Sequence, residues 1–269
     1  MEKLALIYDF DKTLSPKDMQ EFHYISTLGY KKAKDFWAKC GELTDKNNMD
    51  SNLSYMLLMQ KERPNLTKKE LLAEGKYITF FKGVDTWFKR INAIGKKHGV
   101  EVEHYIISSG IKEMIEGTSI AKEFKKIYAC SYAYDNNGEI LWPARVVNYT
   151  TKTQYLFRIN KGVLDERNDF DLNRSTPEDE KYIPFSNMVY FGDGLTDVPS
   201  MKVVLGNGGN TVAIYDSASE KQTLAAELKK DKRATFALKA DYSKGSKIEQ
   251  VITGIIESIE AKNRLEKFR

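Results

Sequence analysis

Residues 4–13 read LALIYDFDKT, a short apolar run followed at once by two carboxylates, Asp9 and Asp11. A short apolar run bounded by turn residues is typical of a β-strand. Carboxylates this close repel each other, and a hard divalent cation such as Mg²⁺ would relieve the repulsion. A strand that ends in a turn with a capping carboxylate explains the same pattern, so these residues alone leave both interpretations open.

Four more short β-rich runs follow, at residues 103–108, 187–191, 211–215 and 235–238. Each of them except the last is followed by a polar turn and a helical pattern. This alternation predicts an α/β fold with a parallel sheet and helices on both faces. Residues 128–134 and 140–147 flank the turn-forming sequence DNNG and predict a β-hairpin ribbon.

The composition excludes several classes of protein. The 269 residues include 42 basic and 38 acidic side chains, and a net charge of +4 does not fit a nucleic-acid wrapper. The mean hydropathy is −0.51, without an apolar run long enough to span a membrane. We therefore expect a soluble, cytoplasmic protein. Cys40 and Cys130 lie far apart, which predicts buried free thiols rather than a disulfide or zinc site.

Residues 15–83 contain no convincing strand and several helical patterns, so they predict an inserted helical subdomain. Thr67 and Glu70 have the spacing of a capping box and predict a helix that continues over residues 71–81. The aromatic side chains here fit a helical core better than a ligand cage; they include Phe22, Tyr24, Phe36 and Trp37.

Two further strands also end in residues that can carry chemistry. Residues 188–197 read MVYFGDGLTD, in which Asp193 lies between two glycines and Asp197 follows. A β-turn with Asp197 as the N-cap of the next helix is the simpler alternative. The strand at 103–108 leads into Ser108, Ser109 and Gly110 before a helix, where a hydroxyl and free amides can hold an anion, although serine is also a common helix cap.

Three strands that end in Asp-x-Asp, in Ser and in Gly-Asp-Gly-x-x-Asp together resemble the haloacid dehalogenase-like (HAD) hydrolase superfamily. A helical insertion directly after the first motif is similar to its phosphoserine phosphatase-like branch. The resemblance covers nearly the whole chain. It implies a Rossmann-like catalytic core of residues 1–14 and 84–269, with a helical cap at 15–83 that closes over the site as a lid.

The resemblance also implies residue roles in phosphomonoester hydrolysis. Asp9 is the expected nucleophile that forms an aspartyl-phosphate, and Asp11 the expected acid and base. Mg²⁺ is the expected cofactor, and the expected metal residues are Asp9, Asp11 through its backbone carbonyl, Asp193 and Asp197. Asp197 is alternatively expected to orient a lysine. The phosphoryl group is expected to bind Ser108, Ser109, Gly110 and Lys152.

The superfamily's lysine has two candidates here, Lys152 and Lys161. Lys152 follows Thr151, a good N-cap, and so opens its helix at the end that attracts anions. Lys161 precedes Gly162 at the opposite end, and we therefore expect Lys152 to be the functional one. The same reasoning places residues 167–180, predicted to be a loop, away from the site.

The substrate is expected to be a small phosphorylated metabolite, not a nucleic acid or a membrane. Asp18 stands where phosphoserine phosphatases carry a Glu for the substrate's amino group, and Lys12 replaces a commonly small residue. Gln20 and Glu21 are further candidates, or else form a solvated helix face, and Tyr149 either lines or packs the cleft. Residues 15–83 carry 12 basic and 9 acidic side chains, an excess that suits an anionic substrate.

The leading hypothesis is thus a Mg²⁺-dependent phosphatase, because the resemblance implies that superfamily ATPases and dehalogenases lack an Asp at position 11. Nucleotide or sugar phosphatases, a phosphotransferase and a catalytically silent phospho-ligand binding module are the alternatives.

Overall fold

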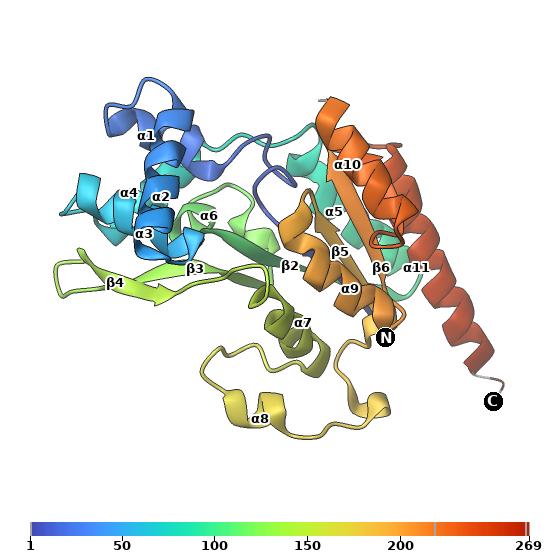
Figure 1. Cartoon of the computed structure of the whole chain (residues 1–269). Coiled ribbons are helices and arrows are strands. Elements are labelled where there is room, and N and C mark those ends of the chain that lie inside the picture. Colours follow the sequence, from blue (N-terminus) through green and yellow to red (C-terminus); the bar gives the residue numbers. More distant parts are fainter. Residues whose placement is uncertain (1, 218, 267, 269) are drawn as a thin grey trace.

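A seven-stranded sheet forms the centre of the computed structural model, which describes residues 2–217, 219–266 and 268 (Figure 1). Helices cover both of its faces, so the predicted α/β fold is confirmed. The strands are β1 (Glu2–Tyr8), β2 (Val100–Ile111), β3 (Lys126–Tyr134), β4 (Ile140–Arg145), β5 (Met188–Gly192), β6 (Asn210–Tyr215) and β7 (Phe236–Lys239).

The strand order is β4-β3-β2-β1-β5-β6-β7, and every neighbouring pair is parallel except β3 and β4. The chain starts in the middle of the sheet with β1, builds outward to β4, and returns to the other side of β1 with β5. Tyr8, the last residue of β1, pairs with Ile106 of β2 and Phe191 of β5. This is the switch point where open α/β sheets bind their ligands.

The central strands are apolar along their whole length because both of their faces are covered. Every residue of β5 is buried, as are the last five of β1. The helices are α1 (Tyr24–Thr27), α2 (Ala33–Asn47), α3 (Ser51–Glu62), α4 (Lys68–Glu74), α5 (Val84–Lys97), α6 (Lys112–Glu116), α7 (Lys152–Lys161), α8 (Asp169–Asn173), α9 (Val198–Gly206), α10 (Ser219–Lys230) and α11 (Lys247–Glu266). Among them, α5 and α11 pack on one face, and α7 and α9 lie on the other.

Residues 15–83 form α1 to α4, which lie together above the ribbon of β3 and β4 (Figure 1). Backbone hydrogen bonds join the two parts: the Lys68 amide donates to the Gly138 carbonyl at 2.9 Å, and the Ile140 amide to the Leu66 carbonyl at 3.0 Å. The Tyr132 hydroxyl donates to the Met56 carbonyl at 2.8 Å. The helices of this segment are therefore held to the ribbon by hydrogen bonds, in addition to their covalent links to the chain before residue 15 and after residue 83.

Several predicted boundaries need correction. The capping box of Thr67 and Glu70 is present, but α4 ends at Glu74 rather than at 81, and one 3₁₀ turn (Gly75–Tyr77) follows it. Residues 167–180 are not all loop, because Asn168 caps the short helix α8 by accepting from the Asp171 amide. Helix α11 follows β7, where no helix is predicted. The local sequence pattern does not reveal a helix as short as α8, and it does not show where tertiary packing ends a helix such as α4.

Predictions about buried side chains hold for the cysteines and for two of the four named aromatics. Cys40 and Cys130 are buried free thiols. Tyr24 and Phe36 belong to the hydrophobic core, whereas Phe22 and Trp37 are half-buried and Trp37 lines the cavity described below. No helix among the described residues is both long enough and apolar enough to cross a membrane.

A buried hydrogen-bond chain joins α5 to the central strands. The Trp87 indole donates to the Tyr8 hydroxyl at 2.8 Å, and that hydroxyl lies 3.1 Å from Nδ1 of His104. Nε2 of His104 lies 2.9 Å from Oδ1 of Asn92, which can only accept. Nε2 therefore carries the proton and Nδ1 accepts from Tyr8, so the imidazole is neutral. Burial lowers the pKa of His104 from 6.5 to about 3.

This buried histidine predicts acid sensitivity. Below pH 6.5 the unfolded chain binds a proton on His104 that the folded chain excludes, so folding stability is lost as the pH falls toward about 3. The contribution amounts to about 1.4 kcal/mol per pH unit within that window. Urea unfolding of the wild type and of His104→Gln at a series of pH values below 6.5 measures it. Equal slopes for the two proteins would contradict a neutral, buried His104.

Candidate active site

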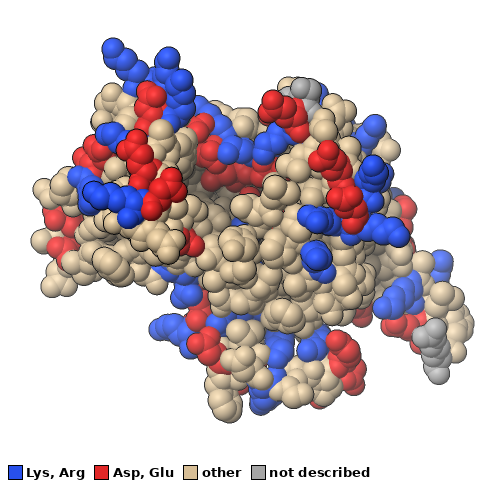
Figure 2. Space-filling model, in the orientation of Figure 1, with Lys and Arg blue, Asp and Glu red and all other residues tan. Residues whose placement is uncertain are grey.

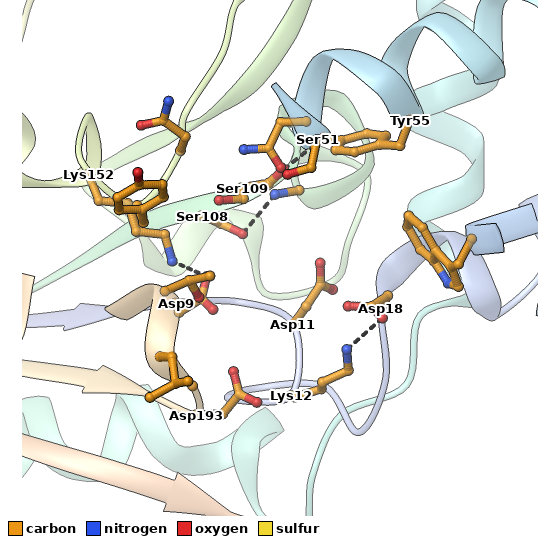
Figure 3. Close-up of a pocket in the computed structure, with 18 of the residues that line it drawn as sticks. Asp9, Asp11, Lys12, Asp18, Ser51, Tyr55, Ser108, Ser109, Lys152 and Asp193 are labelled. Atoms are coloured by element: carbon orange, nitrogen blue, oxygen red, sulfur yellow. Dashed lines mark hydrogen bonds and ion pairs between the residues drawn. The ribbon is translucent and has the colours of Figure 1, made fainter. Parts of the chain in front are cut away.

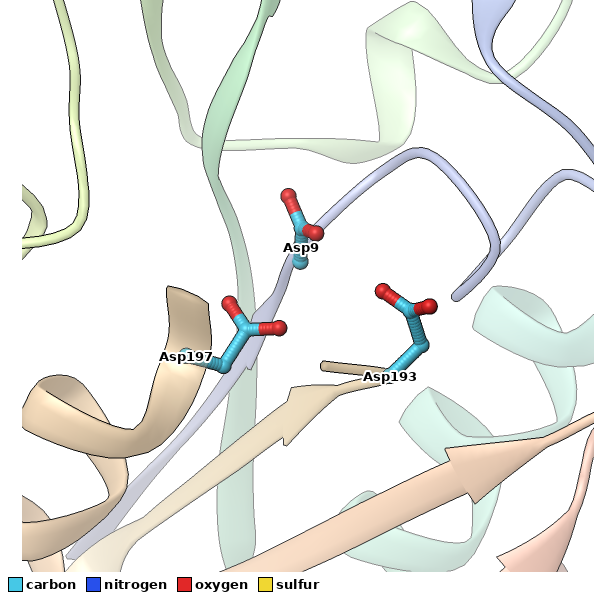
Figure 4. Close-up of side chains that lie close together, drawn as sticks. All are labelled: Asp9, Asp193 and Asp197. Carbon is cyan, nitrogen blue, oxygen red and sulfur yellow. The ribbon is translucent and has the colours of Figure 1, made fainter. Parts of the chain in front are cut away.

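Three aspartates meet at the carboxyl ends of β1 and β5. Asp9 follows β1, Asp193 follows β5, and Asp197 lies just before α9; one carboxylate oxygen from each lies within 4.8 Å of the others. Figure 4 shows the three side chains pointing toward one another. The sequence predicts this meeting, because parallel strands bring their carboxyl ends to one edge.

Lys152 lies against this cluster. Its Nζ is 3.1 Å from Oδ1 of Asp9 and 2.7 Å from Oδ1 of Asp197, and its side chain is 1% exposed. Lys161, the other candidate lysine, lies at the opposite end of α7, where it donates to the carbonyls of Leu172 and Arg174. Burial alone would lower the pKa of Lys152, but Asp197 and Asp9 hold it well above its ordinary value.

The predicted helix cap before Lys152 is different in the structure. Thr151 occupies the N-cap position, but its side chain makes no capping hydrogen bond to α7. Instead Asn148 organises the turn: its Oδ1 accepts from the amides of Thr150 and Thr151 at 3.1 and 2.9 Å. Asparagine side chains stabilise such turns by hydrogen bonding to nearby backbone amides. The residue spacing alone does not show whether Asn148 or Thr151 makes these hydrogen bonds.

Asp197 holds Lys152 rather than capping α9. It stands at the N-cap position of α9, yet its carboxylate makes no capping hydrogen bond there. Its Oδ1 accepts from the Tyr190 hydroxyl at 2.8 Å as well as from Lys152, and its Oδ2 accepts from the Gly194 amide at 3.3 Å. A Cβ at Gly192 would come within 2.4 Å of Cγ of Asp197, so this close approach requires glycine.

Asp11 stands apart from the three clustered aspartates. Its Oδ1 accepts from the Met19 amide at 2.8 Å, which fixes the carboxyl group at the cavity (Figure 3). A Cβ at Gly110 would lie 2.1 Å from Cε of Met19 and 3.0 Å from Oδ2 of Asp11. Glycine at position 110 is therefore needed for the packing that positions Asp11 from the β2 side.

Burial and mutual repulsion favour the protonated forms of these acids. Burial raises the pKa of Asp9 to about 7, because the opposing charge of Lys152 is partly offset by Asp197 and Asp193. Burial, Asp18 and Asp9 raise the pKa of Asp11 well above its ordinary value. Burial and Asp197 also raise the pKa of Asp193. The site therefore lacks positive charge, and a proton or a metal ion can supply it.

The segment 108–110 lies at the cavity as predicted, but its local structure differs. Strand β2 continues to Ile111, and α6 begins only at Lys112. The amide of Gly110 donates to Oγ of Ser108 at 3.1 Å, so the expectation that this amide is free is wrong. Ser108, Ser109 and Gly110 all line the cavity. The register of β2 against β3 shifts between Ile107 and Ile111, an irregularity that the pattern of a single strand does not reveal.

A cavity of about 500 Å³ lies over the aspartates. Ser51 and Tyr55 of α3 face it from the side opposite Asp9 and Asp193 (Figure 3). The space-filling view shows a hollow lined by acidic side chains between the region of α1 to α4 and that of α9 and α10 (Figure 2). Residues 15–83 therefore form one wall of the cavity, and the strand ends form its floor.

Lys221 is a cavity residue that the sequence analysis does not find. It lies on α10, and its Nζ is 2.6 Å from Oδ2 of Asp193. No motif surrounds it, and only its place in the helix after β6 could have drawn attention to it.

The predicted substrate-binding residues near η1 (Met19–Glu21) have different surroundings. Asp18 pairs with Lys12 at 2.6 Å. The backbone of Lys12 has a φ of 59°, in the left-handed region that residues other than glycine rarely adopt. Gln20 is 2% exposed and lines the cavity, so the solvated-face interpretation is wrong for it. Glu21 accepts a hydrogen bond from the Trp37 indole at 2.7 Å. Tyr149 lines the cavity.

The donor set fits Mg²⁺. Asp9, Asp193 and Asp197 offer hard carboxylate oxygens, which Mg²⁺ prefers. Their three negative charges are opposed by two lysines, Lys152 and Lys221, so one negative charge is uncompensated before Asp11 is considered.

The fold is similar to that of solved haloacid dehalogenase-family hydrolases and phosphoserine phosphatases. A HAD family hydrolase from Salmonella enterica serovar Typhi aligns with a TM-score of 0.57 at 15% identity, over 88% of this chain and 68% of that one. A substrate-bound phosphoserine phosphatase aligns with a TM-score of 0.57 at 16% identity, over 90% of this chain and 95% of that one. At these identities the likeness shows the fold.

Sequence comparison adds one relative. A Borreliella burgdorferi protein described as uncharacterized is 29% identical over an alignment that covers 91% of this chain and 93% of that protein. No protein-family model matches the chain.

The acidic cluster predicts that Mg²⁺ stabilises the protein. Binding at a hundredfold excess over the Kd would contribute about 2.7 kcal/mol, a rise in Tm of roughly 5–10 °C for a chain of this size. Asp193→Asn should lose most of this rise, because it removes one negative donor. Asp231→Asn, at an exposed aspartate just after α10 and not among the cavity residues, is the control and should keep it. Thermal melts with MgCl₂ or with chelator measure the shift, and equal shifts in all three proteins would place the ion elsewhere.

Proposed function

We propose that the chain is a Mg²⁺-dependent phosphomonoesterase that acts on a small phosphorylated metabolite through an aspartyl-phosphate on Asp9. The observation that carries the proposal is the buried Asp9 carboxylate, held beside Lys152 on the floor of a cavity whose opposite wall comes from residues 15–83. The fold shared with phosphoserine phosphatases supports it.

Asp9 is the proposed nucleophile. A carboxylate oxygen of Asp9 forms the bond to phosphorus while the bond from phosphorus to the ester oxygen breaks, and the electron pair leaves with that oxygen. Lys152 and the Ser108 hydroxyl lie at the same cavity and are the proposed ligands of the phosphoryl oxygens. Asp197 positions Lys152 for this task through its 2.7 Å contact.

Asp11 is the proposed acid and base. It lies at the cavity, outside the three-aspartate cluster, so it is free to approach the leaving group. It gives its proton to the leaving alcohol. It then takes a proton from the water that attacks phosphorus, the bond from phosphorus to Asp9 breaks, and inorganic phosphate is released.

Mg²⁺ would be held by Asp9, by Asp193 and by the backbone carbonyl of Asp11, and Oδ2 of Asp197 is a further donor. When bound, the ion supplies positive charge that lowers the repulsion between the nucleophile and the phosphate. We further propose that residues 15–83 act as the cap of a core formed by residues 1–14 and 84–269, because Ser51 and Tyr55 bring α3 over the floor.

The proposal predicts hydrolysis of p-nitrophenyl phosphate that requires Mg²⁺ and stops with EDTA. Asp9→Asn should lower kcat by at least about 10³-fold, because amide oxygen is a poor nucleophile. Asp231→Asn serves as the control and should retain activity. If the wild type hydrolyses no ester in Mg²⁺ yet binds phosphate compounds, the chain is a binding module instead.

Asp11→Asn provides a separate test of the intermediate. The p-nitrophenolate leaving group needs little protonation, so the first step should survive, whereas water attack should slow by about 10²–10⁴-fold. Rapid mixing should therefore show a burst of nitrophenol close to one equivalent of enzyme. Slow release with no burst, together with normal folding, would argue against a covalent intermediate that Asp11 helps to break down.

A further inference from the structure

Among the described residues that line it, the cavity offers no unpaired cation for a second anionic group of a substrate. Its described lining residues include three lysines and neither arginine nor histidine. Lys12 pairs with Asp18 at 2.6 Å, Lys221 with Asp193 at 2.6 Å, and Lys152 with Asp197 at 2.7 Å. The lysines and arginine of residues 15–83 do not line it, so the expectation that their excess charge meets the substrate is wrong.

The acidic groups on the wall opposite Asp9 are occupied as well. Asp50 caps α3, and its Oδ1 accepts from the amides of Asn52 and Leu53 at 2.8 and 3.4 Å. Its Oδ2 accepts from the Asn148 side chain at 3.0 Å. Asp18 is paired with Lys12. The described residues of this wall therefore include no unpaired carboxylate for a substrate ammonium group, and its other polar groups are uncharged.

Gln20 is the group on this wall that most clearly lacks a partner. Its side chain is 2% exposed and borders the cavity, and its Oε1 has no hydrogen-bond partner among the described residues. A buried acceptor without a donor is unfavourable, so a ligand that brings a donor to this place is stabilised there. Ser51 and Asn52 border the same cavity with neutral polar side chains.

We propose that the alcohol part of the substrate is an uncharged polyhydroxy group, as in a sugar or polyol phosphate, and that Gln20 accepts a hydrogen bond from one of its hydroxyls. The inference rests on the proposed phosphatase function and narrows its substrate. Hydroxyl groups match the neutral donors and acceptors of the wall, whereas a carboxylate would enter a cavity of acidic groups without a free cation to receive it.

The first experiment compares kcat/KM of the Mg²⁺-loaded wild type for sorbitol 6-phosphate, phosphoserine and phosphoethanolamine, with p-nitrophenyl phosphate as reference. The polyol phosphate should exceed both charged esters by at least about tenfold. Equal values, or a preference for either charged ester, overturn the inference but leave the phosphatase proposal intact. Failure to hydrolyse any of the four, the reference included, overturns the phosphatase proposal itself.

The second experiment tests Gln20. Gln20→Met removes the acceptor at similar volume and should lower the ratio of kcat/KM for sorbitol 6-phosphate to that for p-nitrophenyl phosphate by at least about fivefold. Gln222→Met, the same change at an exposed position of α10, should leave the ratio unchanged. An unchanged ratio in a folded Gln20→Met protein would show that Gln20 is only structural and would overturn its role.

A third variant covers the case in which Gln20→Met fails to fold. Ser51 is exposed and lies at the cavity, so Ser51→Arg adds a cation to the neutral wall without opening the core. It should raise kcat/KM for phosphoserine relative to sorbitol 6-phosphate by at least about tenfold. If this ratio does not change, the missing cation is not what excludes the carboxylate, and the inference falls.

Discussion

The buried ion pairs of Lys152 with Asp9 and Asp197 are the interaction on which the rest of the site depends. An isolated charge in this environment would be strongly unfavourable, and removing one partner of such a group commonly costs several kcal/mol. The fold must therefore bring the end of β1, the start of α7 and the start of α9 together before any of these residues is tolerated. The switch point of the sheet achieves this, because β1 and β5 are neighbours there although residues 9–187 lie between them in the sequence.

The sequence predicts the floor of the site well and its opposite wall poorly. Asp9, Asp11 and Asp193 follow apolar strands, and the edge of a parallel sheet is a place that pattern can identify. Lys152 could be chosen over Lys161 because helix polarity distinguishes the two ends. These predictions rest on local periodicity and on one topological rule. The residue roles built on them remain proposals.

The rest depends on tertiary packing that local pattern does not contain. Gln20 reads as a solvated residue until α1 to α4 are placed over the sheet, and Lys221 carries no motif. The Thr151 cap is replaced by Asn148 because two side chains compete for the same turn. The early end of α4 and the presence of the short helix α8 also depend on tertiary packing, so the local pattern does not predict them. Net charge over residues 15–83 was equally uninformative, because it does not say which side chains face inward.

The attachment of residues 66–68 to the β3–β4 ribbon has a consequence for how this protein could acquire a new substrate. Ser51 and Asn52 lie on one segment and Asn148 and Tyr149 on another, about a hundred positions later, yet they share a single wall. Asn52 and Asn148 even contact the same aspartate, Asp50. Recombination that exchanged only residues 15–83 would replace Ser51 and Asn52 but keep Asn148 and Tyr149, so the two parts of this cavity wall would no longer match. The side chains that would select the substrate therefore come from two distant parts of the sequence. A change of substrate would require matching substitutions in both parts.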